Sequence, residues 1–140
     1  MAFYGSTEWL NLFQETLNSS KEFAKAAGNF SASMLVATEI KGLPKIMYVW
    51  LELHNGKLRD WAYLATSKEK KTDFIFTSDY YTWKAICRGD MDVIKAVVSG
   101  KIKLTGNKLK LVKQTRMSLA LLEVMKQLPT TFPDDAFQRQ

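Results

Sequence analysis

Residues 46–65, IMYVWLELHNGKLRDWAYLA, contain the strongest local structural signal of the sequence. Two apolar and aromatic runs flank Asn55-Gly56, a dipeptide that favours the positive φ angles of a type I′ hairpin turn. Counting outward from this turn gives three cross-strand pairs: Glu52 with Arg59, Trp50 with Trp61, and Tyr48 with Tyr63. One opposite-charge pair and two aromatic pairs agree with a single register, so the segment predicts a β-hairpin.

Both faces of this predicted hairpin are largely apolar. The face opposite the aromatic pairs carries Met47, Val49 and Leu51, whereas a sheet with one wet face alternates apolar and polar residues. We therefore expect helices of the same chain on one face, and another segment, a ligand or a second subunit on the other. A homodimer would use the predicted outer aromatic face, formed by Tyr48, Trp50, Trp61 and Tyr63.

Helix and strand signals continue on both sides of the hairpin. Apolar spacing and capping residues predict these elements: a helix over 7–27, a strand over 30–40, a strand over 72–77, a helix from Ser78 or Asp79 to Arg88, a helix from Asp90 or Asp92 to Val98, a strand over 101–105 and a helix over 108–128. This order indicates an α+β fold. We expect one domain of residues 1–128, followed by a tail of residues 129–140 that begins with Pro129.

Composition excludes several classes of protein. The chain has 140 residues, of which 46% are hydrophobic, and this suits one sizeable core. A single cysteine, Cys87, cannot form an internal disulfide. The longest stretch without charge, Ala26 to Thr38, is shorter than the roughly 20 residues of a membrane-spanning helix. The first residues, MAFYGSTEW, lack the pattern of a secretory signal, so we expect a cytoplasmic protein.

The positive charge of the chain is concentrated in one segment. The net charge is +6, and residues 101–116 contain no acidic residue. The basic residues of this segment are Lys101, Lys103, Lys108, Lys110, Lys113 and Arg116. Such a segment can form a solvated helix face. It can also attract the carboxylate or phosphate of a ligand, or an anionic membrane surface. Nucleic acid is disfavoured, because the segment holds no aromatic residue on which a base could stack.

Residues for catalysis are scarce. The only histidine, His54, lies beside the predicted turn, and one His with one Cys forms no zinc-type cluster. Asp90 and Asp92 are explained as helix caps. The sequence has no glycine-rich phosphate-binding loop. We expect no catalysis, no metal and no cofactor.

The predicted helix over 108–128 is apolar over an unusually wide arc. Two adjacent stripes carry its apolar residues: Met117, Leu121, Val124 and Leu128 in one, and Val112, Leu119, Leu122 and Met125 in the other. This helix either lies deep in its own core or also contacts a ligand, a partner or a membrane.

Residues 73–107, DFIFTSDYYTWKAICRGDMDVIKAVVSGKIKLTGN, resemble the sterol carrier protein (nonspecific lipid-transfer) domain family. The resemblance rests on the order and spacing of Asp79, Trp83, Gly89, Asp90, Gly100, Lys101, Ile102, Lys103 and Gly106. The hairpin upstream and the apolar helix downstream also lie where the family has them. The resemblance implies a twisted, five-stranded, mainly antiparallel sheet with helices over one face. It also implies an apolar tunnel that binds a fatty acid, fatty acyl-CoA, phospholipid or sterol-like lipid.

This resemblance and the apolar surface together predict the site. The pocket wall is expected from Trp83, Ile86, Ile94, Val97, Val98, Met117, Leu121, Val124, Met125 and Leu128. The six basic residues of the 101–116 segment are expected to attract the headgroup or a membrane surface. The chain ends in Gln138-Arg139-Gln140 instead of a Ser-Lys-Leu-type address, and it lacks the enzyme region often fused to this domain, so a fatty acid or phospholipid is favoured over a sterol. The alternatives are an enzyme or accessory subunit acting on acyl-CoA thioesters, and a basic interaction module.

Overall fold

A five-stranded sheet is the base of the fold in the computed structural model, which describes residues 2–40, 46–132 and 134. Its strands lie in the order β4-β3-β2-β5-β6. They are β2 (Ala32–Glu39), β3 (Ile46–His54), β4 (Lys57–Leu64), β5 (Phe74–Asp79) and β6 (Lys103–Thr105). Only β2 and β5 pair in parallel, and the other neighbours are antiparallel. The predicted five-stranded, mainly antiparallel α+β fold is therefore confirmed.

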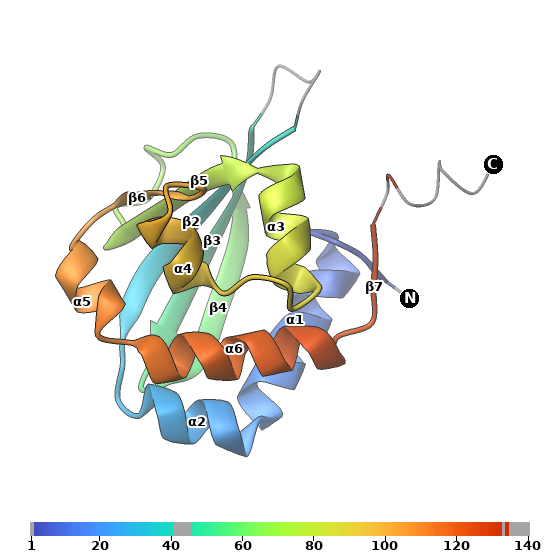
Figure 1. Ribbon diagram of the computed structural model, residues 1–140. Helices are drawn as coiled ribbons and strands as arrows, with labels where there is room; N and C mark the ends of the chain where they lie inside the picture. The colour runs from blue at the N-terminus through green and yellow to red at the C-terminus, as the bar shows by residue number, and fades with distance from the viewer. Residues whose placement is uncertain (1, 41–45, 133, 135–140) are drawn as a thin grey trace.

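Helices pack on one side of this sheet, as expected. They are α1 (Thr7–Ser19), α2 (Lys21–Ala27), α3 (Tyr80–Cys87), α4 (Val93–Val98), α5 (Lys108–Val112) and α6 (Thr115–Gln127). Figure 1 shows α6 lying across the sheet, with α2 below it and α3 and α4 above it. Within the described part of the chain, no helix is both long and apolar enough to span a membrane.

The Asn-Gly turn forms as the sequence predicts. Asn55 has a φ angle of 49° and Gly56 one of 75°, as a type I′ turn requires. A Cβ atom on Gly56 would lie 2.7 Å from the carbonyl oxygen of Gly28, at the end of α2. Glycine is therefore needed here both for its backbone angle and for the close approach of a second segment.

The register beyond the turn differs from the prediction. Leu53 pairs with Leu58, but a β-bulge follows, so Glu52 pairs with Asp60 and Leu51 with Trp61. The predicted pairs Glu52–Arg59, Trp50–Trp61 and Tyr48–Tyr63 are wrong. A bulge places one extra residue in one strand and moves every following pair by one position.

Side chains from α1 bind the β4 backbone at this bulge. Asn18 accepts a hydrogen bond from the Leu58 amide at 2.8 Å and donates one to the Leu58 carbonyl at 2.9 Å. Gln14 donates to the carbonyls of Leu58 and Arg59. The α1 helix thus satisfies backbone groups of an edge strand at the place where the hairpin register shifts.

The bulge divides the four hairpin aromatics between the two sheet faces. Trp61 and Tyr63 pair with Leu51 and Val49 on the face covered by the helices, and the Tyr63 hydroxyl donates to the Gly5 carbonyl at 2.6 Å. Tyr48 and Trp50 lie on the opposite face with their partners Leu64 and Ala62. The prediction that all four residues share one aromatic face is therefore wrong. A homodimer through Tyr48, Trp50, Trp61 and Tyr63 stays a prediction, although these residues do not form a common surface.

The second sheet face is covered from within the chain. Leu35, the β2 partner of Trp50, is fully buried on this face. The Lys70 ammonium lies 4.0 Å from the centroid of the Trp50 ring. Lys70 belongs to the connection between β4 and β5, which lie on opposite sides of β2 in the sheet. The cover expected for this face was another segment, a ligand or a second subunit. The structure shows another segment of the same chain over it.

Two predicted helices are each divided in the structure. The helix expected over 7–27 breaks at Ser20, whose backbone is extended and whose side chain caps α2 by accepting from the Phe23 amide. The helix expected over 108–128 breaks at Lys113 and Gln114. Gln114 has a φ angle of −95° and a ψ angle of 40°, and its side chain makes no capping hydrogen bond.

The end of the described chain packs against its beginning. The short strands β1 (Ala2–Phe3) and β7 (Thr130–Thr131) pair in parallel, and the Phe132 ring is buried and stacked on Tyr4. These contacts bring part of the expected tail, residues 130–132, onto the folded chain. The boundary between a domain of residues 1–128 and a tail of residues 129–140 stays a prediction, and residues 133 and 135–140 lie outside the described residues.

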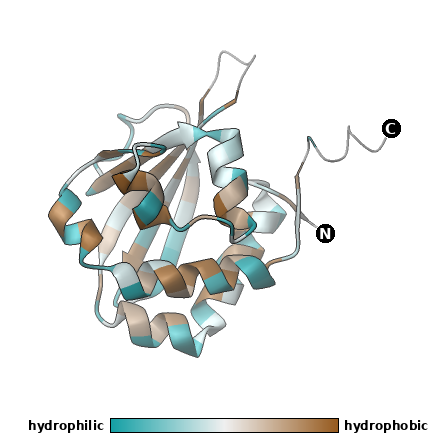
Figure 2. Cartoon of the chain, in the orientation of Figure 1, coloured by the Kyte–Doolittle hydropathy of each residue, from teal (hydrophilic) through white to brown (hydrophobic). Residues whose placement is uncertain are grey.

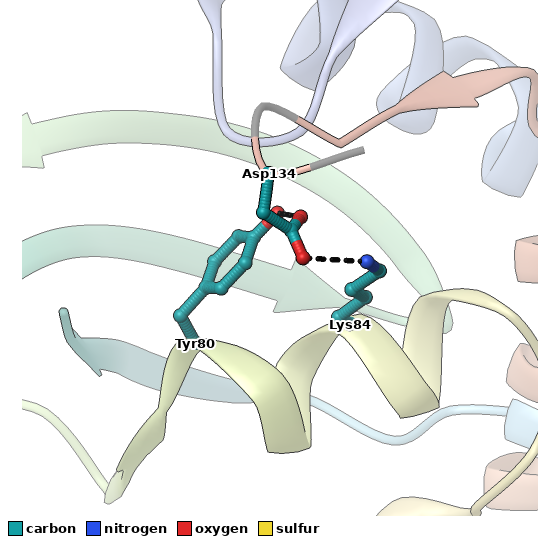
Figure 3. A network of polar contacts seen from close by, with 3 residues as sticks. All are labelled: Tyr80, Lys84 and Asp134. Carbon is teal, nitrogen blue, oxygen red and sulfur yellow. Dashed lines mark hydrogen bonds and ion pairs between the residues drawn. The ribbon is translucent and has the colours of Figure 1, made fainter. Parts of the chain in front are cut away.

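Asp134 fixes this C-terminal segment to α3. Its carboxylate accepts hydrogen bonds from the Tyr80 hydroxyl at 2.6 Å and from the Lys84 ammonium at 2.8 Å (Figure 3). Desolvation acts to raise the pKa of the Asp134 carboxyl, but the hydrogen bonds from Lys84 and Tyr80 outweigh it and lower that pKa below its ordinary value. The carboxylate is therefore ionised at neutral pH and pairs with the buried Lys84 ammonium.

Candidate functional site: an apolar cavity between sheet and helices

A cavity of about 160 Å³ lies between the sheet and the helices. Alternate residues of the inner sheet face form one wall: Met34, Val36, Met47, Val49, Leu51, Leu53, Leu58 and Phe76. Helices and the N-terminal segment form the other: Tyr4, Gly5, Trp9, Leu10, Phe13, Leu17, Phe23, Trp83, Ile86, Cys87, Val93, Ile94, Leu111, Gln114, Met117, Ser118, Leu121 and Met125. Nearly all of this surface is apolar, so it is suited to an apolar ligand.

Six of the ten predicted wall residues line this cavity. They are Trp83, Ile86, Ile94, Met117, Leu121 and Met125. Val97, Val124 and Leu128 are buried outside the lining, and Val98 is 62% exposed on α4. Lipid binding by the six lining residues remains a prediction at this point.

Sequence reasoning missed the contributions of α1 and of the sheet. Trp9, Leu10, Phe13 and Leu17 follow one apolar side of α1, which the sequence shows only as an amphipathic helix. The sequence predicts helices of the same chain over one face of the hairpin, but it does not show that a cavity lies between that face and the helices. Periodicity shows that a face is buried, and it does not distinguish a face against a cavity from one against a packed core.

Most polar groups of the lining are satisfied within the protein. The Trp9 indole donates to the Thr130 hydroxyl at 2.9 Å, and the Trp83 indole donates to the Ala37 carbonyl at 3.3 Å. The Ser118 hydroxyl donates to the Asp92 carboxylate, which also caps α4. Hydrogen bonds of this kind remove exposed donors from the cavity surface, which leaves burial of apolar area as the main source of binding energy.

Burial makes the ionisable lining groups unreactive at neutral pH. It raises the pKa of the Cys87 thiol to about 12, and it raises the pKa of the Tyr4 phenol well above its ordinary value. Both groups are therefore neutral at physiological pH. A thiol attacks as its thiolate, so Cys87 is a poor nucleophile in this environment.

The cavity is small compared with a long-chain lipid, but its wall is adaptable. A dry cavity of about 150 Å³ is known to bind a molecule the size of benzene. Met34, Met47, Met117 and Met125 line this one, and the flexible thioether side chain adjusts to ligands of different shape. An acyl chain therefore requires the wall to move outward, and methionines are the residues best suited to that movement.

The six basic residues of the 101–116 segment lie outside the cavity and are all exposed. Between Lys108 and Lys110, the Leu109 side chain is 75% exposed on α5. Figure 2 shows apolar and polar residues close together on this short helix. Two helix positions away, Leu111 is buried and lines the cavity, so α5 connects the basic surface to the cavity wall.

A second hollow lies at the surface between α3, α6 and the C-terminal segment. Its lining consists of Cys87, Arg88, Met125, Lys126, Leu128, Thr130 and Phe132. Unlike the cavity, this recess has a largely polar surface. Within the described residues, no group of three or more His, Cys, Asp or Glu side chains could hold a metal ion.

Comparison with known proteins gives a family and a fold. The model of the SCP-2 sterol transfer family matches residues 8–117. None of the curated proteins matches the sequence closely enough to count as a relative.

Several solved structures share the architecture. A crystal structure of sterol carrier protein 2 has a TM-score of 0.76 at 23% identity, covering 89% of this chain and 98% of that one. A conserved hypothetical protein from Thermus thermophilus has a TM-score of 0.79 at 24% identity, with 90% of each chain covered. The apo form of sterol carrier protein 2 from Yarrowia lipolytica has a TM-score of 0.56 at 20% identity, covering 91% and 93%. At these identities the structures establish the fold.

Proposed function

Because the chain belongs to the SCP-2 sterol transfer family, we propose that its apolar cavity binds one lipid and carries it through water, without catalysis. The observation that supports this most directly is the composition of the cavity lining, which is apolar on both the sheet side and the helix side. Removing apolar ligand surface from water contributes about 25 cal/mol per Å², before the cost of ordering the ligand.

The ligand classes that fit are a fatty acid, a fatty acyl-CoA, a phospholipid and a sterol-like molecule. We favour a flexible acyl chain over a rigid ring system. Four methionines can move to admit a chain that bends with the cavity, whereas a sterol would need a wider space opened at once. The headgroup stays outside, since the cavity offers few free polar partners.

The cavity contains its own reporters for testing this function. Trp9 and Trp83 both line it, so a bound acyl chain changes the polarity around two indole rings. Titration with hexadecanoic acid is expected to change the tryptophan emission and to saturate at one molecule per chain. Emission that does not change, together with no uptake of a fluorescent fatty acid, would contradict the proposal.

We also propose that the basic segment brings the protein to anionic membranes, where it loads or releases lipid. Lys108, Lys110 and Lys113 surround the exposed Leu109 side chain, a combination that suits both the charge and the apolar boundary of a lipid surface. Leu111 on the same helix lines the cavity. A basic module for nucleic acid would instead show steeply salt-dependent binding to oligonucleotides.

An enzyme acting on acyl-CoA thioesters is the second candidate, and two observations count against it. The Cys87 thiol has a pKa of about 12, and His54 is exposed at the hairpin turn, where its ring lies 3.3 Å from the Asn55 amide. Incubation with hexadecanoyl-CoA at neutral pH is expected to release no free CoA thiol above a protein-free control. Catalysed release that is lost on removing one of these side chains would support the enzyme instead.

A further inference from the structure

The hydroxyl of Thr38 is buried beneath the helices without a hydrogen-bond partner. Thr38 is the last residue but one of β2, and its side chain is fully buried. In the part of the chain that the structure describes, its Oγ1 atom is the one buried side-chain oxygen or nitrogen that no partner satisfies. An unpaired hydroxyl in the interior costs stability, so such a group in a folded protein requires an explanation.

Thr38 lies on the sheet face that forms the cavity wall. Met34 and Val36 precede it on β2 at intervals of two residues, and both line the cavity. Alternate residues of a strand share one face of the sheet, so Thr38 continues this row just beyond the lining. Its antiparallel partner on β3, Met47, also lines the cavity. The unpaired hydroxyl therefore lies at one end of the sheet wall.

The polar groups around Thr38 are satisfied, in contrast to Thr38 itself. Ser78, its parallel partner on β5, is also buried, and the Ser78 hydroxyl donates to the Lys101 carbonyl at 2.7 Å. The carbonyl of Ala37, the preceding residue, accepts a hydrogen bond from the Trp83 indole at 3.3 Å. The fold thus provides partners for the neighbouring groups but, among the described residues, none for the Thr38 hydroxyl.

A second hydroxyl, that of Tyr4, lies close to Thr38. Tyr4 lines the cavity, and its ring makes edge contacts with Trp9 and Tyr80 at centroid distances of 5.1 and 6.1 Å. Burial raises the pKa of the Tyr4 phenol, and the Thr38 hydroxyl is near enough to act against that rise. The two groups do not, however, have the geometry of a hydrogen bond. Two neutral hydroxyls therefore lie near each other at this end of the cavity without being paired.

We propose that the cavity binds a lipid whose buried end carries a hydroxyl, and that this hydroxyl forms hydrogen bonds with Thr38 and Tyr4. The inference rests on the proposed lipid-binding function and adds two specificity-determining residues to it. Thr38 comes into contact with the ligand when the flexible side chain of Met47 moves aside. A hydroxyl both donates and accepts, so one inserted group satisfies both protein hydroxyls. A methyl group in the same place leaves Thr38 unpaired, so a purely apolar chain end is disfavoured.

The empty protein provides a first test that needs no ligand. Thr38→Val replaces the unpaired hydroxyl by a methyl group of similar size, and we expect it to raise the melting temperature by about 4 °C. Thr77 is the matched control, because it follows the cavity residue Phe76 on β5 and so lies on the opposite sheet face. Thr77→Val is expected to shift the melting temperature by less. A Thr38→Val protein that is less stable than the wild type would show that this hydroxyl already has a partner, and the proposal would fail.

Paired ligands then test the selectivity. Fatty acids from decanoic to hexadecanoic acid are titrated beside their counterparts with a terminal hydroxyl, so that each pair differs by one oxygen atom and the series matches chain length to cavity depth. At the matching length we expect the wild-type protein to favour the hydroxylated acid by about fivefold. Tyr4→Phe is expected to weaken this preference and Thr38→Val to reverse it, a reversal that a loss of folding cannot produce. Thr77→Val is expected to keep the wild-type preference.

A second pair distinguishes a hydroxyl on a chain from one on a ring system. Cholesterol and its 3-deoxy analogue carry the same contrast on a rigid molecule, and selectivity for this pair alone would assign the site to a sterol-like hydroxyl. Equal binding of both members of every pair by the wild-type protein would overturn the hydroxyl site and leave lipid binding intact. Failure to bind any of these ligands would overturn the lipid-binding function itself.

Discussion

The Lys84 ammonium lies 2.8 Å from the Asp134 carboxylate, and this ion pair fixes the C-terminal segment to α3. The neighbours of Lys84 along α3 include Trp83, Ile86 and Cys87, which line the cavity. Thr130, four residues before Asp134, contacts α1, because its hydroxyl accepts a hydrogen bond from the Trp9 indole. The end of the described chain therefore supports two cavity walls, α1 and α3, at the same time.

Replacing Asp134 with Asn is expected to reduce stability in a pH-dependent manner. The folded-state pKa of this carboxyl is lowered, so its contribution is complete above the unfolded pKa of about 4 and is lost as the pH falls below it. We expect Asp134→Asn to cost about 1 kcal/mol at pH 7, and the difference from wild type to shrink as the pH falls below about 4.

Urea denaturation at a series of pH values measures this difference. Tyr80→Phe removes one hydrogen bond to the same carboxylate and keeps the Lys84 pair, so it is expected to show a smaller loss with the same direction of pH dependence. A stability difference for Asp134→Asn that stays constant from pH 7 to pH 3 would show that ionisation of Asp134 plays no part.

Replacing Leu121 with Asp is expected to abolish lipid binding. Leu121 lines the cavity, and a carboxylate there has no partner and must be desolvated by a bound acyl chain. Leu119, two residues earlier on α6, is 49% exposed and lies outside the lining, so Leu119→Asp is the control. We expect Leu119→Asp to change stability by less than about 0.5 kcal/mol and to bind normally.

Fatty acid titration, with circular dichroism on the same samples, separates binding from folding for this pair. The expected result is a Leu121→Asp protein that keeps its far-ultraviolet spectrum and loses saturable binding. Normal binding by folded Leu121→Asp would mean that the ligand does not occupy this part of the cavity.

Gly56→Ala is expected to destabilise the protein more than Gly100→Ala. Both glycines have positive φ angles, which cost a non-glycine residue about 1 kcal/mol. A Cβ on Gly56 would also meet the Gly28 carbonyl oxygen at 2.7 Å, whereas one on Gly100 would meet nothing within 4 Å. The extra cost at Gly56 is expected to be about 1–2 kcal/mol, measured as the difference in unfolding free energy. Equal costs would mean that α2 moves away from the turn without penalty.

Removing the charges around Leu109 is expected to weaken membrane binding. Vesicles of phosphatidylglycerol and phosphatidylcholine should retain the wild-type protein at low salt. Lys108→Gln/Lys110→Gln/Lys113→Gln should bind them on the order of 100-fold less, at about 1 kcal/mol per charge. Leu109→Ser tests the apolar contribution separately. Cosedimentation measures both effects, and equal binding of the wild-type protein and the triple variant to the anionic vesicles would argue against an electrostatic contact.

The elements set by local chemistry could be predicted from the sequence. The turn at Asn55-Gly56 and the helix starts at Asp79 and Asp92 depend on neighbouring residues, and all three form in the structure. The five-stranded, mainly antiparallel sheet also agrees with what the family resemblance implies. These signals are local because turns and caps are satisfied by backbone groups a few residues away.

The breaks in these elements depend on distant contacts. The hairpin bulge coincides with hydrogen bonds from Gln14 and Asn18 of α1, about forty residues away in sequence. The break between α5 and α6 at Gln114 contains no Gly or Pro that would predict it from the sequence. This break allows both Leu111 and Met117 to line the cavity. The cavity wall combines residues of α1, the sheet and α6. Only the part from the segment that resembles the family and from the last predicted helix could be predicted, because the other contributors come together only in the folded chain.

Native mass spectrometry of the purified protein, followed by organic extraction, tests lipid carriage most directly. We predict that the protein carries one acyl lipid per chain from its expression host, and that Leu121→Asp, purified in the same way, carries none. A wild-type protein that is empty, and that also remains empty after incubation with hexadecanoic acid, would contradict the lipid-binding function.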